Sequence, residues 1–349
     1  MNDNVDAAVL GAGSWGTALA KLLADNGHHV RLWARRPEQA EAIDRARENP
    51  DYLPGFALPE NLRTTSDLIE AIDGVKLVLS VVPTHGLRAV LETAAPLLTE
   101  DAPILSCTKG IEQGTLMRVS QIFEEHLPES QQRMLTYLAG PSFAREVAAR
   151  MPTAVTVAGH DEDVAHRVQH YLRNDTFRVY TTDDVVGAEL GGALKNVIAI
   201  AAGIGDGLGF GHNSRAAIIT RGLAEISRLA VAMGGRDETL AGLGGLGDLV
   251  LTCTGRLSRN RHVGVELGRG RPLDAILAGM RMVAEGVRTT TAALALGGQY
   301  QVELPIAAQM AEVLAGRCTP SEAVGCLMLR PQRGEFDRRA RPDSASGAA

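Results

Sequence analysis

Short apolar runs recur along the first half of the chain, and segments with helical spacing separate them. The runs occupy residues 7–10, 30–33, 77–82, 104–107, 135–138 and 154–157. Runs of this length that are bounded by turn residues are typical of buried strands. Because they alternate with helical segments, they predict an α/β unit built on a mostly parallel sheet.

The pattern changes near residue 183. Beyond this point the chain is rich in Ala, Leu and Gly and has helical spacing, for example over residues 218–233. The sequence Thr-Thr-Asp-Asp over residues 181–184 provides side chains that cap a helix N-terminus, just before an apolar segment. We therefore predict an α/β domain over residues 1–182, an all-helical C-terminal domain over 183–338 and a disordered tail over 339–349.

The composition limits the class of protein. Hydrophobic residues make up 45% of the chain and charged residues 22%, the net charge is -6 and the pI is near 5.9. These fractions are ordinary for a soluble globular protein, and the charge provides no basic surface for nucleic acid. We expect no nucleic-acid partner.

The sequence also bears on the compartment. None of the four cysteines forms a C-x-x-C pair or a zinc-finger cluster, and residues 1–6 lack the apolar run of a signal peptide. The longest apolar stretch, 190–204, is interrupted by Lys195 and Asn196 and is shorter than the ~20 residues that span a bilayer. We expect a cytoplasmic protein without a membrane helix. His166 and His170 lack the H-E-x-x-H pattern, so no metal is expected.

A glycine-rich turn follows the first predicted strand. Gly11, Gly13 and Gly16 form the pattern G-x-G-x-x-G and open a helix that stops at Asn26-Gly27, before the second strand. In a Rossmann-type unit these glycines allow the tight turn, the approach of the pyrophosphate and the packing of helix on strand. The pattern predicts a dinucleotide cofactor, with a plain glycine turn as the alternative.

The second predicted strand is followed by Arg35 and Arg36 instead of the acidic residue that accepts from the ribose 2′-hydroxyl of NAD. Guanidinium groups suit a 2′-phosphate in charge and geometry. We therefore expect NADPH as the preferred cofactor, with NADH possible. An ordinary solvated loop is the alternative for these two arginines.

Lysine is rare in this chain. Only four of the 35 Lys and Arg residues are lysines, namely Lys21, Lys76, Lys109 and Lys195. Lys195 lies in the apolar stretch 190–204, where a buried ammonium needs a partner or a function. A lysine beside a nicotinamide is a candidate general acid and base, and the alternative is a side chain that extends to solvent.

Lys109 follows the predicted strand 104–107, at the sheet edge where ligands bind in open α/β folds. A second cation near Lys195 would polarise a carbonyl oxygen and lower the pKa of its neighbour.

Asp248 ends the glycine-rich run 242–247 and begins an apolar segment, so a helix N-cap and a catalytic role are both open. The segment 256–261 contains Arg256, Ser258, Arg259, Asn260 and Arg261, which suit a phosphate dianion, although a solvated basic loop is the alternative.

Several motifs together resemble those of bacterial NAD(P)-dependent glycerol-3-phosphate dehydrogenases, from about Val5 to Phe336. They are Gly-Ala-Gly-Ser-Trp-Gly at 11–16, Leu-Pro-Gly at 53–55, Val-Pro at 82–83, Thr-Lys-Gly at 108–110, Ala-Gly-Pro-Ser-Phe-Ala at 139–144, Leu-Lys-Asn at 194–196, Gly-Asp at 247–248, Ser-Arg-Asn at 258–260 and Val-Ala-Glu-Gly at 283–286.

The resemblance implies a set of site residues. Those that would contact the cofactor are Gly11, Gly13, Ser14, Trp15, Gly16, Arg35, Arg36, Lys109, Ala144, Arg259, Val283 and Glu285. Those that would surround the substrate are Lys109, Gly140, Ser142, Lys195, Asp248, Ser258, Arg259 and Asn260.

The implied reaction is reversible hydride transfer between NAD(P)H and dihydroxyacetone phosphate, which gives sn-glycerol 3-phosphate for phospholipid synthesis. Lys195 would be the general acid and base, Lys109 would stabilise the oxyanion, and Asp248 would orient Lys195. Arg259 and Asn260 would bind the substrate phosphate, and the protein would be a homodimer. Two alternatives remain: another Rossmann-plus-helical dehydrogenase of the 3-hydroxy-acid type, and a dinucleotide-sensing module without catalysis.

Overall fold

One sheet of eight strands forms the core of the N-terminal half, in the order β3-β2-β1-β4-β5-β6-β7-β8. The computed structural model of the chain describes residues 4–280, 284–332 and 334–335. All neighbouring strands are parallel except β6 and β7, which are antiparallel. The strands are β1 (Asp6–Leu10), β2 (His29–Trp33), β3 (Leu62–Thr65), β4 (Leu77–Ser80), β5 (Ile104–Ser106), β6 (Leu135–Ala139), β7 (Thr153–Ala158) and β8 (Phe177–Thr182).

The predicted α/β fold with a mostly parallel sheet is confirmed. All six apolar runs lie on strands, although β4 ends at Ser80 and not at residue 82. The prediction missed the edge strands β3 and β8. Strands β2 and β3 lie on one side of β1, and β4 and the later strands lie on the other. Open α/β sheets bind ligands at such a point, where the strand order changes side.

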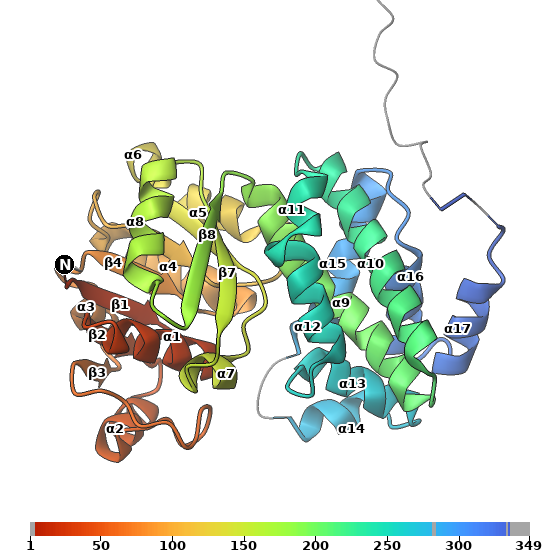
Figure 1. Cartoon of the computed structure of the whole chain (residues 1–349), viewed down its shortest axis with the longest axis horizontal. Coiled ribbons are helices and arrows are strands. Elements are labelled where there is room, and N and C mark those ends of the chain that lie inside the picture. The colour runs from red at the N-terminus through yellow and green to blue at the C-terminus, as the bar shows by residue number, and fades with distance from the viewer. Residues whose placement is uncertain (1–3, 281–283, 333, 336–349) are drawn as a thin grey trace, which may run out of the picture.

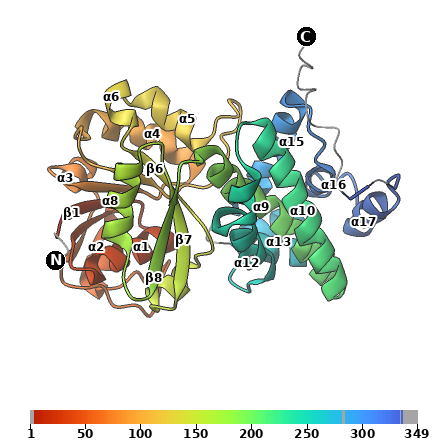
Figure 2. The ribbon, with the colours of Figure 1, turned by 45° about the horizontal axis from the view of Figure 1, so that its top comes forward.

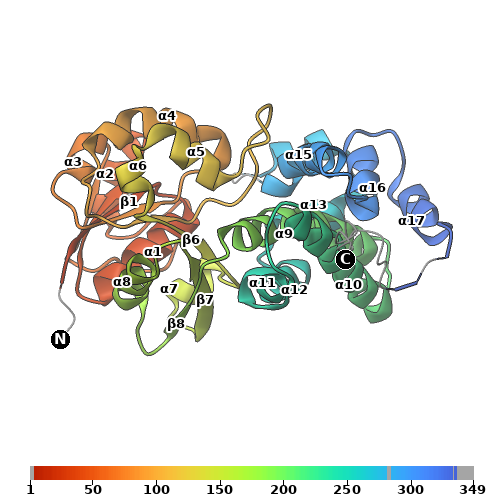
Figure 3. The ribbon, with the colours of Figure 1, turned by 90° about the horizontal axis from the view of Figure 1, so that it is seen from above.

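Helices cover both faces of the sheet because successive strand residues point to opposite sides. In β1, Ala7 and Val9 pack with α1, α2 and α8, whereas Ala8 and Leu10 pack with α3, α4 and α5. Figure 3 shows α8 and α4 on opposite sides of the sheet. The helices of this half are α1 (Ser14–Asp25), α2 (Pro37–Ala46), α3 (Leu68–Ile72), α4 (Thr84–Ala94), the 3₁₀ turn Ala95–Leu97, α5 (Val119–His126), α6 (Glu129–Gln132), α7 (Ala144–Ala148) and α8 (Glu162–Leu172).

The C-terminal half is helical and lies beside the sheet (Figure 1). Its long helix α9 (Val185–Gly207) begins after Asp184, whose carboxylate accepts a hydrogen bond of 2.8 Å from the Gly187 amide, so the predicted N-cap is confirmed. Around α9 pack α10 (His212–Ala232), α11 (Asp237–Ala241), the π-helical turn Leu243–Gly247, α12 (Asp248–Thr254), α13 (Arg259–Gly268), α15 (Glu285–Gln299) and α16 (Pro305–Leu314). Helix α14 (Leu273–Ala278) packs on α13, and α17 (Pro320–Met328) packs on α16.

Helices α9 and α13 approach closely at glycines, and Figure 2 shows the two side by side. A Cβ on Gly203 would lie 2.1 Å from the Arg261 carbonyl oxygen, and one on Gly264 would lie 2.0 Å from that of Ile200. Side chains at these positions would push the helices apart. The backbone of α13, which begins at Arg259, is therefore held directly against the helix that carries Lys195.

The length argument against a membrane helix is wrong, because α9 has 23 residues. Among the described residues, it is the one helix long and apolar enough to cross a bilayer, but 89% of its most apolar stretch is buried inside the protein. A core helix of a soluble protein meets the same criterion, so α9 is weak evidence for a span. The predicted tail 339–349 lies outside the described residues, and the division into domains at 182 stays a prediction.

Candidate active site

The glycine turn follows β1 directly and leaves no room for side chains at two positions. Gly11 has φ +120°, and a Cβ there would lie 2.8 Å from the Val81 carbonyl oxygen. A Cβ on Gly16 would lie 1.8 Å from the carbonyl oxygen of Gly11. Gly13, by contrast, faces open space, with no atom within 4 Å of the place of a Cβ. The turn is therefore tight on its inner side and open on the side where a ligand would approach.

The start of α1 fits a bound pyrophosphate. Helix α1 begins at Ser14, and no side chain caps its first amides, so its positive end faces the open side of the turn. The Ser14 hydroxyl donates to the Tyr52 carbonyl, which ties the turn to the loop after α2. Trp15 and Ala144 pack against one small apolar cluster, which brings the Ala144 segment beside the start of α1.

The two arginines after β2 are exposed and lie near the turn. Arg36 donates to Gln39 at 3.3 Å, and the Gln39 side chain donates to the Ala12 carbonyl at 2.7 Å. Burial, followed by Arg288 and Arg35, lowers the pKa of His85 at the start of α4. Arg35, after β2, and Arg288, on α15, thus place positive charge near the first turn of α4.

Two lysines share one buried carboxylate. Lys109 Nζ lies 2.7 Å from Asp248 Oδ2, and Lys195 Nζ contacts Asp248 Oδ1. The Asp248 side chain is 2% exposed, that of Lys195 8% and that of Lys109 21%. The cluster joins the end of β5, the middle of α9 and the start of α12. Lys195 does not extend to solvent and Asp248 is not a helix cap, so the structural alternatives for these two residues are excluded.

The surroundings lower the pKa values of both Lys195 and Asp248, for different reasons. Burial lowers the pKa of Lys195 to about 7, and the repulsion by Lys109 adds to this effect against the attraction of Asp248. Burial raises the pKa of Asp248, but the two lysines outweigh it and the net pKa lies below the usual value. At neutral pH the cluster therefore combines an ionised carboxylate with a lysine that can give or take a proton.

An amide network lies next to Lys195. Asn260 donates to the Asn196 side chain at 2.8 Å, and its own carbonyl oxygen accepts from the Gly286 amide at 2.9 Å. The network fixes α13 and the start of α15 against α9. Asn196 belongs to the motif Leu-Lys-Asn at 194–196 but has no predicted role, although an amide beside Lys195 in an apolar helix is a usable signal.

In the basic segment 256–261, some side chains have structural partners and others are exposed. Ser258 is the N-cap of α13 and accepts from the Arg261 amide at 3.2 Å. Arg261 pairs with Asp206, so its charge is already used. Arg259 is exposed at the first position of α13. Of the two arginines of α13, Arg259 is therefore the better placed to meet a ligand.

Gly140 lies at the carboxyl edge of the sheet, as Lys109 does, because both follow parallel strands. Gly140 follows β6 with φ +119°, and the Ser142 hydroxyl donates to its carbonyl at 3.1 Å. A Cβ on Gly110 would lie 3.8 Å from Glu285 Oε2, so the Glu285 carboxylate approaches the Lys109 loop. Val283 lies outside the described residues.

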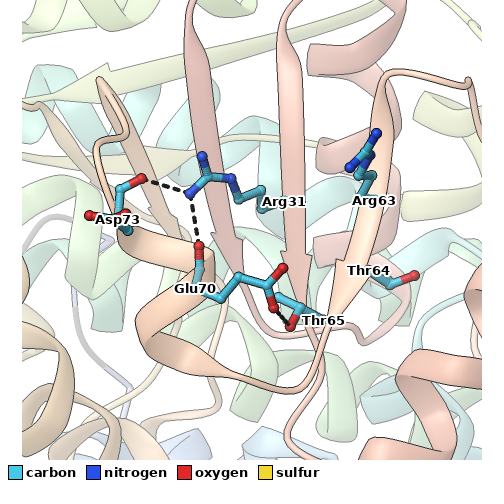
Figure 4. Close-up of a pocket in the computed structure, with 6 residues that line it drawn as sticks. All are labelled: Arg31, Arg63, Thr64, Thr65, Glu70 and Asp73. Carbon is cyan, nitrogen blue, oxygen red and sulfur yellow. Dashed lines mark hydrogen bonds between the residues drawn. The ribbon is translucent and has the colours of Figure 1, made fainter.

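A separate pocket lies away from this cluster. It has a volume of about 320 Å³ and lies on β2, β3 and α3, lined by Arg31, Arg63, Thr64, Thr65, Glu70 and Asp73 (Figure 4). Arg31 is already bonded there to the carbonyl oxygens of Glu70 and Asp73. Strands β1 and β4 separate this pocket from β5, so it takes no part in the lysine cluster.

Comparison with known proteins places the chain in a family. The family model described as NAD-dependent glycerol-3-phosphate dehydrogenase N-terminus matches residues 6–165, and the model of its C-terminus matches residues 184–325. A glycerol-3-phosphate dehydrogenase (NAD(P)+) from Citrifermentans bemidjiense is 57% identical, over 94% of this chain and 98% of that protein. One from Syntrophotalea carbinolica is 54% identical, over 94% of this chain and 99% of that protein.

A solved structure agrees with these relatives. The crystal structure of glycerol-3-phosphate dehydrogenase from Coxiella burnetii has a TM-score of 0.89 and 39% sequence identity, and the match covers 94% of this chain and 99% of that one. The resemblance drawn from the motifs is thus confirmed over both halves of the chain: this protein belongs to the NAD-dependent glycerol-3-phosphate dehydrogenase family.

Proposed function

We propose that this chain catalyses reversible hydride transfer between NAD(P)H and dihydroxyacetone phosphate, with sn-glycerol 3-phosphate as the reduced product. The observation that carries the proposal is the buried cluster of Lys195, Lys109 and Asp248 at the edge of the sheet. This is the edge that also bears the glycine turn. The cluster provides a proton donor and a fixed positive charge, the two requirements for reducing a carbonyl group.

Lys195 is the proposed general acid. A bound NAD(P)H supplies the hydride to the keto carbon, and the electron pair of the C=O bond moves to oxygen. Protonated Lys195 gives its proton to that oxygen, and in the reverse direction neutral Lys195 removes the proton of the hydroxyl group. A pKa of about 7 suits both directions at neutral pH.

Lys109 and Asp248 have separate proposed roles. Lys109 stabilises the negative charge that develops on the substrate oxygen and does not transfer a proton. Asp248 holds both ammonium groups and orients Lys195, because its two carboxylate oxygens contact different lysines.

The proposed cofactor contacts are the predicted ones. Gly11, Gly13 and Gly16 shape the turn, and Ser14 and Trp15 begin α1. Arg35 and Arg36 favour NADPH over NADH, since their exposed guanidinium groups match a 2′-phosphate. The other proposed cofactor contacts are Lys109, Ala144, Arg259, Val283 and Glu285.

The proposed phosphate site of the substrate contains Arg259 and Asn260. Arg259 contributes charge, and Asn260 an amide whose orientation is fixed by Asn196 and Gly286. Gly140, Ser142 and Ser258 complete the proposed surroundings of the substrate. We further propose a cytoplasmic homodimer that supplies glycerol 3-phosphate for phospholipid synthesis.

The test is an assay of NADPH and NADH oxidation with dihydroxyacetone phosphate, and with acetoacetate as a substrate that carries a carboxylate. We expect turnover with dihydroxyacetone phosphate only. Turnover should be about tenfold or more faster with NADPH than with NADH, because hydrogen bonds between the arginines and the 2′-phosphate join charged groups. Turnover with acetoacetate alone would indicate a 3-hydroxy-acid dehydrogenase. Binding of NADPH without turnover of either substrate would indicate a sensing module.

A further inference from the structure

Glu189 is a buried carboxylate on α9 that the proposed mechanism does not use. It accepts hydrogen bonds from Arg118 Nη1 at 2.6 Å, from the Ser120 amide at 2.7 Å and from the Ser120 hydroxyl at 2.7 Å. The Glu189 side chain is 7% exposed and that of Arg118 16%. One carboxylate of the helical half thus holds the N-terminus of α5 in the α/β half.

The bonded end of α5 is directly connected to Lys109. The segment between β5 and α5 closes on itself, since Ile111 and Arg118 form an isolated antiparallel bridge. The Glu112 amide also donates to the Met117 carbonyl at 2.9 Å. Arg118 is therefore fixed to a residue only two positions from Lys109, and a displacement of Arg118 moves the Lys109 loop.

The same loop also contacts α9 at Gly192 and α12 at Asp248. A Cβ on Gly192 would lie 3.6 Å from Cδ of Lys109, so the aliphatic part of Lys109 lies along α9. Lys109 Nζ then reaches Asp248, which also holds Lys195. Because Glu189, Gly192 and Lys195 are spaced by three residues, they follow one side of the helix.

The space between the loop and α9 is small. A cavity lined by Thr108, Lys109, Tyr137, Glu189 and their neighbours has a volume of only about 10 Å³. This is room for about one water molecule. The loop is therefore seated closely on α9.

We infer that Glu189 is a positioning residue, which seats the Lys109 loop on α9 and so fixes the two lysines on opposite oxygens of Asp248. The inference rests on the proposed function. Without this carboxylate the Arg118 end of the loop is no longer held on α9. Thr108 and the Lys109 backbone keep their bonds to Val82 and Thr84, but the Lys109 side chain withdraws from Asp248. Lys195 then loses the repulsion of Lys109 and no longer shares Asp248 with it. Both changes favour the protonated form of Lys195.

The test compares Glu189→Gln with Glu225→Gln. Glu225 is a suitable control because it is also buried and accepts two backbone hydrogen bonds, but its partners are the Ile306 and Ala307 amides of α16. We expect kcat for dihydroxyacetone phosphate to fall about 10- to 100-fold in Glu189→Gln, the cost of slightly misplaced catalytic groups. Glu225→Gln keeps wild-type kcat and wild-type NADPH affinity.

A second readout does not require activity. With only four lysines in the chain, ¹³C-labelled lysine side chains can be titrated individually by NMR. We expect the midpoint of Lys195 to rise by about half a pH unit or more in Glu189→Gln, and to stay at its wild-type value in Glu225→Gln.

The inference is overturned if Glu189→Gln keeps both wild-type kcat and the wild-type Lys195 midpoint, or if Glu225→Gln changes both equally. If Glu189→Gln does not fold, the double variant with Arg118→Gln and Glu189→Gln is tested in its place, because it leaves no unpaired buried charge. The expected results are the same. A wild-type protein that does not reduce dihydroxyacetone phosphate would contradict the proposed function, whereas the NMR midpoints would still decide the role of Glu189.

Discussion

At the scale of single residues, the site consists of two ammonium groups that share one carboxylate. A lone pair of Lys195 and Asp248 would hold the proton on the lysine, because the attraction of a nearby carboxylate raises the pKa of an amine. Burial and the second cation, Lys109, act against that attraction. The result is a lysine that can exchange its proton near neutral pH.

Another buried carboxylate, Glu225, makes a prediction about stability. Its oxygens accept from the Ile306 amide at 2.7 Å and the Ala307 amide at 3.3 Å. Burial nevertheless raises its pKa to about 7. The folded protein therefore binds a proton at Glu225 that the unfolded chain, with an ordinary pKa of 4.5, releases at lower pH.

A raised pKa in the folded state means that stability is lost as the pH rises from 4.5 to about 7. Glu225→Gln removes this titration. We expect the free energy of unfolding of the wild type to fall by about 2 to 4 kcal/mol relative to the variant over this range. Urea denaturation of both proteins at several pH values measures the difference, and parallel curves would contradict it.

At the scale of elements, α9 organises the molecule. It carries Glu189 and Lys195 on one side, and it contacts α13 through glycines on another. The close approach brings the backbone of α13 against α9, and with it Asn260 to Asn196. Helix α9 is apolar along its length because other elements pack against nearly every face of it.

Two glycines of α9 offer a matched test of this packing. A Cβ on Gly203 would lie 2.1 Å from a backbone oxygen of α13, whereas one on Gly205 would lie 3.5 Å from the Ile218 side chain, an ordinary contact. We expect Gly203→Ala to lower the free energy of unfolding by about 1 to 3 kcal/mol or more through overpacking. Gly205→Ala should be neutral or stabilising by about 0.5 to 1 kcal/mol, because alanine favours helices. Equal unfolding midpoints for the two variants would be inconsistent with the close contact.

The elements also show where sequence patterns are informative. Strands buried on both faces, such as β1 and β4, give continuous apolar runs, and these were predicted. Strand β3 lies at the sheet edge with the polar sequence Arg63-Thr64-Thr65, so it has no such run. Strand β8 has a clear alternation of buried and exposed residues over Phe177–Tyr180, and this available signal was overlooked.

At the scale of the whole molecule, the candidate site lies where the two halves meet. Lys109 comes from the α/β half, and Lys195 and Asp248 come from the helical half. The sequence singled out both lysines, through their rarity and their apolar or strand-end surroundings. It left Asp248 open between a cap and a site residue, because its contact with Lys109 joins positions 139 residues apart and depends on tertiary packing.

Glu189 was not recognised for the same reason. An acidic residue near the start of an apolar helix has many ordinary explanations, and its partners, Arg118 and Ser120, are about 70 residues away in sequence. Only the packing of α5 against α9 distinguishes it from a solvated acid. The sequence therefore predicts the chemistry of the site better than it predicts the contacts that hold the site together.

The most direct test of the central claim is the substitution Lys195→Met, with the exposed Lys76→Met as the control. In the wild type, we expect kcat/KM for reduction to fall as the pH rises through about 7, because Lys195 must be protonated, and kcat/KM for oxidation to rise over the same range. In Lys195→Met, we expect kcat to fall at least about 100-fold while NADPH binding persists. Turnover within a few fold of the wild type in Lys195→Met would contradict the account.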